Sequence, residues 1–375
     1  MPEADKFQSN PKKPDFASCG VRLFFYPFAL RPRLHLHHTN SQFDFFCVKW
    51  YHILKYVHRP ERMFSMTRGF ITIATGKEMY FQFAKNLLLS YQLYCDSPLP
   101  FAIMCDRENA YTALFDDVVL FEKTEHPYFD KFELLKLAPY DETIFIDSDC
   151  LAYGDLNQYW DYFADADAFT ASGTNYPIDS DQGLFHKEEV GPYVGKVHWK
   201  PDIHGGLYYI RKGEKCDAIY RECRYIAEHY EDFRWPDFCA PFADEPVLCL
   251  AMAAQGCRAL EAYPPNYGIP WEVTEMKCDI FRGLCQYATE WHPLVTDGRL
   301  IHWSVRYCKK PLYRFEVEKL YLMEKYGIRP GNVSGRLSVK DTLLYQYRLR
   351  YYAMLTAEFA GRAVNKLLRI LKVKR

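Results

Sequence analysis

From Gly69 onward the sequence alternates short, uninterrupted apolar runs with helical patterns, and this alternation limits the fold more than any other feature. It predicts strands at Phe70–Thr75, Phe101–Asp106, Val118–Phe121 and Thr143–Asp147, with helices at Met79–Leu93 and Phe132–Leu137 between them. Strands that are apolar along their whole length are typical of parallel sheets, because helices cover both faces of such a sheet. The sequence therefore predicts an α/β fold with a mostly parallel central sheet and helices on both faces.

The polar residues that directly follow the strands are the first candidates for a binding site. Ligands of open α/β sheets bind at the carboxyl ends of the strands, where the loops leave the sheet. Thr75, Asp106 and Asp147 stand at the ends of three predicted strands. We therefore expect these side chains to lie along one edge of the sheet.

Asp-x-Asp tripeptides occur at residues 147–149, 165–167 and 179–181, and chance alone gives about one in a chain of this composition. Residues 165–167 follow a helical pattern and 179–181 lie in a Pro-, Ser- and Gly-rich stretch, so both pairs are interpreted as solvated charges. Only Asp147 and Asp149 follow an apolar strand, where two carboxylates need a counter-charge. A magnesium or manganese ion would satisfy them and keep sites for diphosphate oxygens. The alternative is an N-capping Asp beside an exposed one.

The residues around the first tripeptide resemble a known enzyme family. Asp-x-Asp after a strand, followed by Leu151, Tyr153 and residues 154–156 (Gly-Asp-Leu), is similar to the nucleotide-sugar glycosyltransferases of the glycogenin and lipopolysaccharide galactosyltransferase family, which have the GT-A fold. Lys131 stands where that family has a lysine on the helix before the motif strand. The segment Ile71–Tyr80 resembles the family's first strand, which holds the nucleotide.

Later motifs resemble those of the same family, in the same order. They are His204-Gly205-Gly206, similar to a segment beside the donor sugar; Asp244-Glu245, similar to a segment near the anomeric carbon; His302, similar to a late histidine of the metal site; and Lys309-Lys310-Pro311, similar to a diphosphate-binding Lys-Pro. The resemblance covers roughly residues 69–312.

The resemblance implies a role for each matching residue. It implies Asp147, Asp149 and His302 as ligands of Mn²⁺ or Mg²⁺, and Asp244 or Glu245 as a group that stabilises the departing sugar cation or takes the acceptor's proton. With the polar residues at the strand ends, the predicted substrate-binding residues are Ala74, Thr75, Tyr80, Asp106, Lys131, Asp147, Ser148, His204, Gly205, Gly206, Lys309 and Lys310. The implied reaction moves a sugar from a UDP-sugar to a saccharide, glycolipid or protein acceptor, with retention of anomeric configuration.

Some positions depart from the family pattern and leave other functions open. His204 replaces an asparagine, and Val305 replaces a glycine after the late histidine. Residues 173–203 are interpreted as an insertion between the two halves of the sheet. A protein that binds nucleotide sugars without catalysis is therefore an alternative. Another is a haloacid dehalogenase-like phosphohydrolase, which also places Asp-x-Asp after a strand. Gly205-Gly206 could likewise be a simple tight turn instead of a sugar contact.

Charge and cysteine content bound the cellular setting. The net charge is −1, so nothing indicates nucleic acid as a partner. The 13 cysteines contain no Cys-x-x-Cys pair, which favours buried thiols in a reducing compartment over zinc modules or disulfides. No apolar stretch reaches the roughly 18 residues of a membrane span. With no signal-peptide pattern at the start, we expect a cytoplasmic protein.

The two ends of the chain are basic. Residues 1–65 carry 10 Lys/Arg against 5 Asp/Glu and are interpreted as an irregular extension; residues 66–318 form the predicted GT-A domain, and residues 319–375 a basic helical region. Around residues 360–372 a helix would place Arg362, Lys366 and Arg369 on one face and apolar residues on the other. Such a helix suits an anionic membrane surface, and packing on the protein itself or on a partner is the alternative.

Overall fold

The computed structural model describes residues 66–186, 190–235, 242–261, 267–268, 273–289 and 294–373. The chain divides into two units, residues 1–63 and 64–375, and every described residue belongs to the second. The N-terminal extension predicted over residues 1–65 lies outside the described residues.

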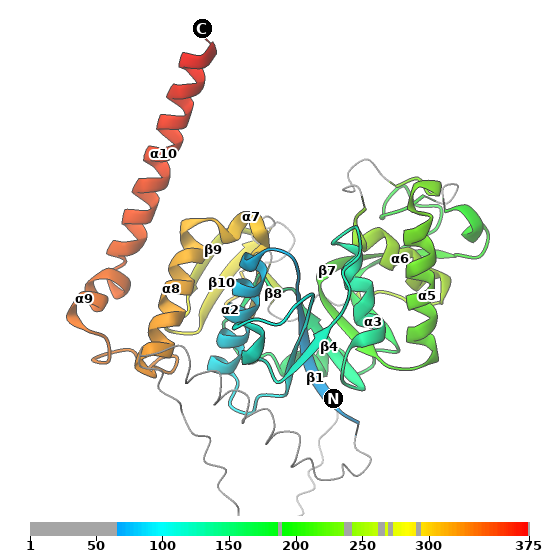
Figure 1. Ribbon diagram of the computed structural model, residues 1–375, viewed down its shortest axis with the longest axis horizontal. Coiled ribbons are helices and arrows are strands. Elements are labelled where there is room, and N and C mark those ends of the chain that lie inside the picture. The colour runs from blue at the N-terminus through cyan, green and yellow to red at the C-terminus, as the bar shows by residue number, and fades with distance from the viewer. Residues whose placement is uncertain are drawn as a thin grey trace, which may run out of the picture. The chain divides into compact units, whose positions relative to one another are not determined.

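A six-stranded sheet forms the centre of the described unit (Figure 1). Its strands are β1 (Arg68–Ala74), β2 (Phe101–Cys105), β3 (Asp117–Leu120), β4 (Glu142–Ile146), β6 (Phe169–Pro177) and β7 (Trp199–Arg211), in the order β3-β2-β1-β4-β7-β6. The first four of this order are parallel to one another, and β7 is antiparallel to both of its neighbours. The predicted α/β fold with a mostly parallel sheet is therefore confirmed.

Helices cover both faces of this sheet, which explains the uninterrupted apolar runs. Helices α2 (Glu78–Tyr94) and α4 (Gln158–Tyr162) pack on one face; α3 (Leu134–Leu137), α5 (Glu214–Glu228) and α6 (Asp244–Ala254) pack on the other (Figure 1). In β4, Ile144 and Ile146 contribute to the first core and Phe145 to the second, all without solvent exposure. Since successive side chains of a strand point to opposite faces, each of them must be apolar here.

A second group of elements packs on the side of α2 that faces away from the central sheet. It contains a small sheet of β5 (Cys150–Ala152), β11 (Leu300–His302) and β8 (Tyr267–Gly268), and a hairpin of β9 (Val273–Asp279) and β10 (Leu284–Thr289). Helices α7 (Ser304–Cys308) and α8 (Pro311–Tyr326) complete its apolar core. Short 3₁₀ turns occur at Thr112–Leu114, Phe129–Glu133, Gly191–Tyr193 and Tyr230–Asp232.

The described chain ends in α9 (Val339–Asp341), a π turn at Thr342–Gln346 and the long helix α10 (Leu349–Val373). Helix α10 includes the helix predicted around residues 360–372. Helix α8 passes through residue 318, where the sequence placed the end of the catalytic domain. Among the described helices, none combines the length and apolarity needed to cross a membrane.

The predicted insertion at residues 173–203 is wrong at both of its ends. Residues 173–177 of β6 pair with residues 199–203 of β7, so these segments belong to the central sheet. The described residues between these segments, 178–186 and 190–198, lie outside the strands of the sheet. The strand could not be predicted from the sequence here, because few apolar residues occur in the outer half of β6, which is half-exposed at the edge of the sheet.

The remaining predictions on charges and thiols agree with the described residues. Asp165, Asp167, Asp179 and Asp181 are exposed, as expected for solvated charges. All ten described cysteines are free and buried.

Candidate active site

A tight turn between β4 and β5 holds the two aspartates of the first tripeptide. The amide of Cys150 donates to the carbonyl of Asp147 at 3.1 Å, which closes the turn, and the amide of Asp147 donates to the carbonyl of Gly206 on β7 at 3.1 Å. Ser148 and Asp149 occupy the turn and are buried, with 7% and 8% of their surface exposed. Both carboxylates therefore lie at the carboxyl end of the central strand.

His302 reaches this turn through strand pairing. Strand β11 runs antiparallel to β5, with His302 opposite Cys150, and the amide of Trp303 donates to the carbonyl of Asp149 at 3.1 Å. This register places His302 Nε2 3.0 Å from Asp149 Oδ1 and 3.6 Å from Asp147 Oδ2. The structure thus brings together the three residues that the sequence proposed as metal ligands.

The three side chains shift one another's proton affinity. Burial raises the pKa of Asp147, and the positive charges of Lys131 and His302 oppose the rise. Burial also acts on Asp149, but the hydrogen bond and charge of His302 outweigh it and hold the pKa of Asp149 below its usual value. For His302, burial lowers the pKa, yet Asp149 and then Asp147 raise it above the ordinary value.

Lys131 connects this group to a second pair of acids. It comes from the 3₁₀ turn before α3, and its Nζ lies 3.1 Å from Asp147 Oδ2, 3.1 Å from Asp244 Oδ2 and 3.0 Å from the carbonyl of Gly205. Burial alone would lower its pKa, but the charges of Asp147 and Asp244 raise it. Lys131 is therefore a fixed cation at the edge of the aspartate turn.

Asp244 and Glu245 form the first turn of α6, where acids interact favourably with the positive end of the helix dipole. Glu245 Oε1 accepts a 2.6 Å hydrogen bond from the amide of Gly205. Burial, followed by the charge of Asp244, raises the pKa of Glu245 to about 7. Glu245 thus changes protonation near neutral pH.

Gly205 and Gly206 lie inside β7 and not in a tight turn, which corrects one of the two interpretations of this pair. A Cβ atom on Gly205 would lie 2.7 Å from Glu245 Oε1, and one on Gly206 would lie 2.6 Å from His302 Nδ1. Larger residues at these positions would displace side chains of the site. The two glycines are needed because β7 passes directly against the acidic and imidazole groups.

His204 lies beside the site on the same strand. Its Nδ1 is 3.2 Å from the donating amide of Gly206 and 3.3 Å from the hydroxyl of Tyr267, and its ring centroid is 5.4 Å from that of His302. Burial, followed by the charges of His302 and Lys131, lowers the pKa of His204 well below its ordinary value. His204 is therefore neutral, and acceptance at Nδ1 leaves the proton on Nε2.

A second polar group lies at the ends of β1 and β2. Asp106 Oδ2 accepts from the amide of Gly76 at 3.0 Å, and Arg107 donates to Asp106 and to the carbonyl of Gly76. Thr75 donates to Asp130 at 3.2 Å. Ala74 is buried at the end of β1. Thr75 and Asp106 thus lie along one edge, as predicted from the strand ends.

Tyr80 ties this edge to the aspartate turn. It is on the first turns of α2, and burial raises the pKa of its hydroxyl, with smaller contributions from Tyr128 and Asp149. Of the predicted nucleotide contacts, Tyr80 is thus the one that senses the charge of a predicted metal ligand, Asp149.

Lys309 and Lys310 lie at the start of α8, next to α10. Lys310 is the N-cap of α8, and its Nζ pairs with Glu358 of α10 at 3.3 Å. Lys309 lines a cleft of about 370 Å³ between α8 and α10. A role for either lysine at a diphosphate stays a prediction.

The donor set fits a divalent cation. The ligand atoms of Asp147, Asp149 and His302 all lie within 4.8 Å of one another, and ligands of a single ion lie roughly 3–4.5 Å apart. Asp147, Asp149, Asp244 and Glu245 bring four carboxyl groups together, with Lys131 and His302 as the basic side chains that contact them. Carboxyl groups outnumber basic groups here, so a divalent cation would be electrostatically favoured, and carboxylate oxygens are ligands that hard divalent ions prefer.

Sequence reasoning missed several residues of the site. Asp130 is 1% exposed and accepts hydrogen bonds from Thr75 and Thr124, and the hydroxyl of Tyr208 lies 3.4 Å from Asp244 Oδ2. Asp130 could have been predicted as a site residue because it directly precedes Lys131. Tyr208 could not, since an aromatic residue in an apolar strand is normally interpreted as part of the hydrophobic core.

Solved structures of glycosyltransferases are similar to the chain at low sequence identity. The bifunctional glycosyltransferase WbbM shares 12% identity over 56% of this chain and 40% of its own, with a TM-score of 0.38. The glycosyltransferase GlyE of Streptococcus pneumoniae shares 13% over 52% of this chain and 46% of its own, with a TM-score of 0.34. An active-site variant of the galactosyltransferase LgtC shares 14% over 72% of this chain and 100% of its own, with a TM-score of 0.41.

The chain spans less than half the length of WbbM and of GlyE. No protein-family model matches the chain, and no curated protein matches it in sequence. The similar structures are glycosyltransferases, the enzyme class that the sequence motifs resemble.

Proposed function

We propose that this protein is a metal-dependent glycosyltransferase of the GT-A kind, which moves a sugar from a UDP-sugar to an acceptor. The observation that carries the proposal is the convergence of Asp147, Asp149 and His302 at the end of β4. His302 is more than 150 residues from the two aspartates, and all three match, in order, the metal-binding motifs of the glycosyltransferases that the sequence resembles.

The three residues would hold Mn²⁺ or Mg²⁺. When bound, such an ion neutralises the charge that develops on a departing nucleoside diphosphate. Lys131, held by Asp147 and Asp244, would add a second positive charge beside the same phosphate oxygens. Because sugar transfer passes through an oxocarbenium-like state, stabilising the leaving group removes much of the barrier.

Of the two acids on α6, Glu245 suits the role of proton acceptor. Its pKa of about 7 lets it take a proton from an acceptor hydroxyl near neutral pH, whereas Asp244 is paired with Lys131. Gly205 and Gly206 let β7 pass close to Glu245 and His302, which keeps both groups beside the aspartate turn. Two parts of the proposal rest on the sequence resemblance alone. They are a hexose as the donor sugar and retention of its anomeric configuration.

The test is a screen of UDP-sugars for Mn²⁺-dependent hydrolysis, in which water replaces the acceptor. We expect release of UDP from at least one sugar donor, abolished by a chelator and restored by Mn²⁺. D149N is expected to lower the rate at least 100-fold, since it replaces a charged carboxylate ligand by a neutral amide.

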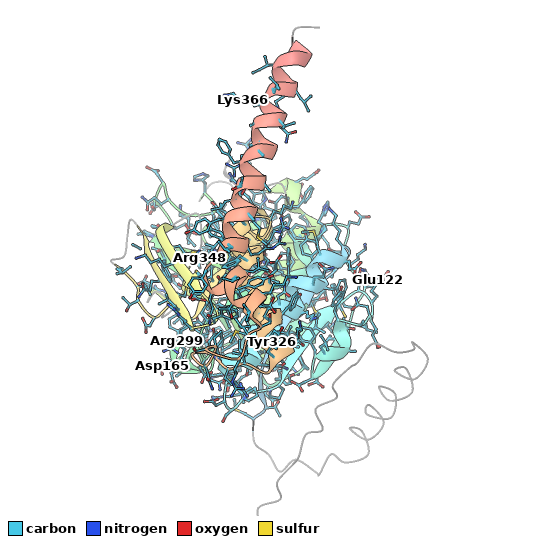
Figure 2. The ribbon with its side chains drawn as sticks, turned by 90° about the vertical axis from the view of Figure 1, so that its left-hand side faces the viewer. Glu122, Asp165, Arg299, Tyr326, Arg348 and Lys366 are labelled. Atoms are coloured by element: carbon cyan, nitrogen blue, oxygen red, sulfur yellow. The ribbon has the colours of Figure 1, made fainter. Side chains whose placement is uncertain are left out.

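The matched control is D165N, the same change in an exposed Asp-x-Asp tripeptide (Asp165 is labelled in Figure 2). It should leave the rate unchanged. Hydrolysis that survives D149N, or that needs no divalent ion, would refute the metal site. Binding of UDP-sugars without turnover would favour a nucleotide-sugar-binding protein.

A further inference from the structure

The second half of α10 is exposed on all sides. From Phe359 to Ile370 every side chain is solvent-exposed, and Phe359, Leu367 and Ile370 expose 75%, 58% and 47% of their surface. Figure 2 shows Lys366 on the part of α10 that extends past the other described elements. Large apolar side chains grouped on a solvent-exposed helix indicate a surface that another molecule or segment covers.

Exposed apolar residues are concentrated here. Of the nineteen exposed large apolar side chains of the described residues, eleven fall between Val339 and Ile370. Singly scattered apolar residues are normal on a protein surface, but a cluster confined to one segment marks an interaction site.

The apolar and basic residues of this segment occupy separate faces. At about 100° per residue, Phe359, Ala363, Leu367 and Ile370 lie along one side of α10, and Ala360, Val364 and Leu368 widen this apolar face to about half of the helix. The cations of the segment are Arg362, Lys366 and Arg369, which fall within roughly 60° on the other half. Glu358, which pairs with Arg362, is the last acid of the helix, so every charge from residue 359 onward is positive.

The first half of α10 is fixed to the catalytic unit. Arg350 makes two 2.9 Å contacts with Glu318 of α8, Met354 is 7% exposed, and the rings of Phe315 and Tyr351 lie 5.4 Å apart. Helix α8 follows directly after the segment that contains His302 and Lys310. A ligand of the exposed half of α10 would therefore be connected to the candidate active site through α10 and α8.

We propose that residues 359–370 of α10 lie in the headgroup region of an anionic lipid bilayer, with the apolar face toward the acyl chains. Charge complementarity favours this occupant, because from residue 359 onward every charge on the helix is positive and fits a surface of negative headgroups. Long Lys and Arg side chains at the edge of the apolar face reach the headgroups while their stems stay buried. No described helix is long and apolar enough to cross a membrane, and the position proposed for this segment is along the interface.

The proposal does not depend on the reaction in the active site. It does have a consequence for that reaction. A chain held on a membrane through α10 would keep α8 and the neighbouring site close to the lipid surface. An acceptor carried by the membrane would then meet the site at high local concentration.

The test is co-flotation of the purified full chain with vesicles of phosphatidylcholine alone or mixed with phosphatidylglycerol. We expect binding to the mixed vesicles only, weakened by salt because the attraction is screened. The variant R362Q/K366Q/R369Q is expected to weaken binding on the order of 100-fold, since each cation near an anionic surface contributes about fivefold. L367Q/I370Q is expected to weaken it about tenfold per residue.

The matched control, K123Q/K196Q/R221Q, neutralises three exposed cations elsewhere and should bind as the unaltered chain does. Release of UDP in solution should be equal in all variants, which separates failure of this proposal from failure of the proposed reaction. Equal binding to both kinds of vesicle, or no effect of the α10 charge variant, would overturn the proposal. A change in the mass of L367Q/I370Q in solution, by sedimentation, would overturn it in favour of a second copy of the chain.

Discussion

His302 Nε2 lies 3.0 Å from Asp149 Oδ1, and this contact depends on the pairing of β11 with β5. Asp149 is placed by the turn after β4, whereas His302 comes from the far end of the catalytic region. The pairing puts His302 opposite Cys150, one residue beyond Asp149. The candidate metal site therefore forms only after the two layers of the domain have joined.

Removal of the imidazole is expected to weaken metal binding. H302A should lower the affinity for Mn²⁺ at least tenfold in isothermal titration, because one of three protein ligands is lost. H229A, which removes an exposed histidine of α5's C-terminal end, is the control and should titrate as the unaltered chain does. Equal affinities in the two variants would show that His302 is not a ligand.

A methyl group on Gly206 is expected to disturb the same histidine. Its Cβ would lie 2.5 Å from the hydroxyl of Tyr267 and 2.6 Å from His302 Nδ1, so G206A should cost about 1–3 kcal/mol of stability and also reduce Mn²⁺ affinity. G361A makes the same change on exposed α10, where nothing lies within 4 Å. It should be neutral, or stabilise by up to about 1 kcal/mol. Urea unfolding measures both, and a G206A chain as stable as G361A would contradict the packing described.

Loss of Lys131 is expected to leave buried carboxylates without their cation. K131M should destabilise the fold by about 3–5 kcal/mol, and the double variant K131M/D244N by less than K131M alone, because one of the stranded charges is gone. The control is K215M, whose partner Asp167 is exposed, and it should cost at most about 1 kcal/mol. Denaturant unfolding at pH 7 provides the numbers. Similar losses in K131M and K215M would mean that Lys131 holds nothing together.

Glu245 is expected to make stability fall as pH rises. Its pKa is about 7 in the folded chain against an ordinary 4.5, so the folded state keeps the proton to higher pH than the unfolded state does. Stability from this group is full below about pH 4.5 and is lost as pH rises to about 7. The free energy of unfolding of E245Q, relative to that of the unaltered chain, should therefore rise by about 1–2 kcal/mol from pH 5 to pH 8. This value includes a discount for the partial exposure of Glu245.

The measurement is the difference in unfolding free energy between the two proteins at each pH. E228Q, which alters an exposed acid of α5, should show a pH-independent difference. A difference between E245Q and the unaltered chain that is the same at both pH values would mean that Glu245 is ionised throughout.

Much of the fold could be predicted because its cause is local. Strands β1 to β4 and helix α2 were placed to within about two residues, since a strand buried on both faces must be apolar at every position. The outer half of β6 escaped prediction because polar residues suffice at a half-exposed edge, and pairing with β7 follows from the neighbouring strand rather than from the residues of β6.

For the site, the sequence by itself determined which groups are present: two carboxylates at the end of a buried strand, a lysine before it and a late histidine. Only the tertiary structure decided which of them meet. Lys131 joins Asp147 and Asp244, whereas Lys310 pairs with Glu358 of α10. The reason is physical: a residue's chemistry belongs to its own side chain, but a distance between two side chains depends on how every intervening element packs.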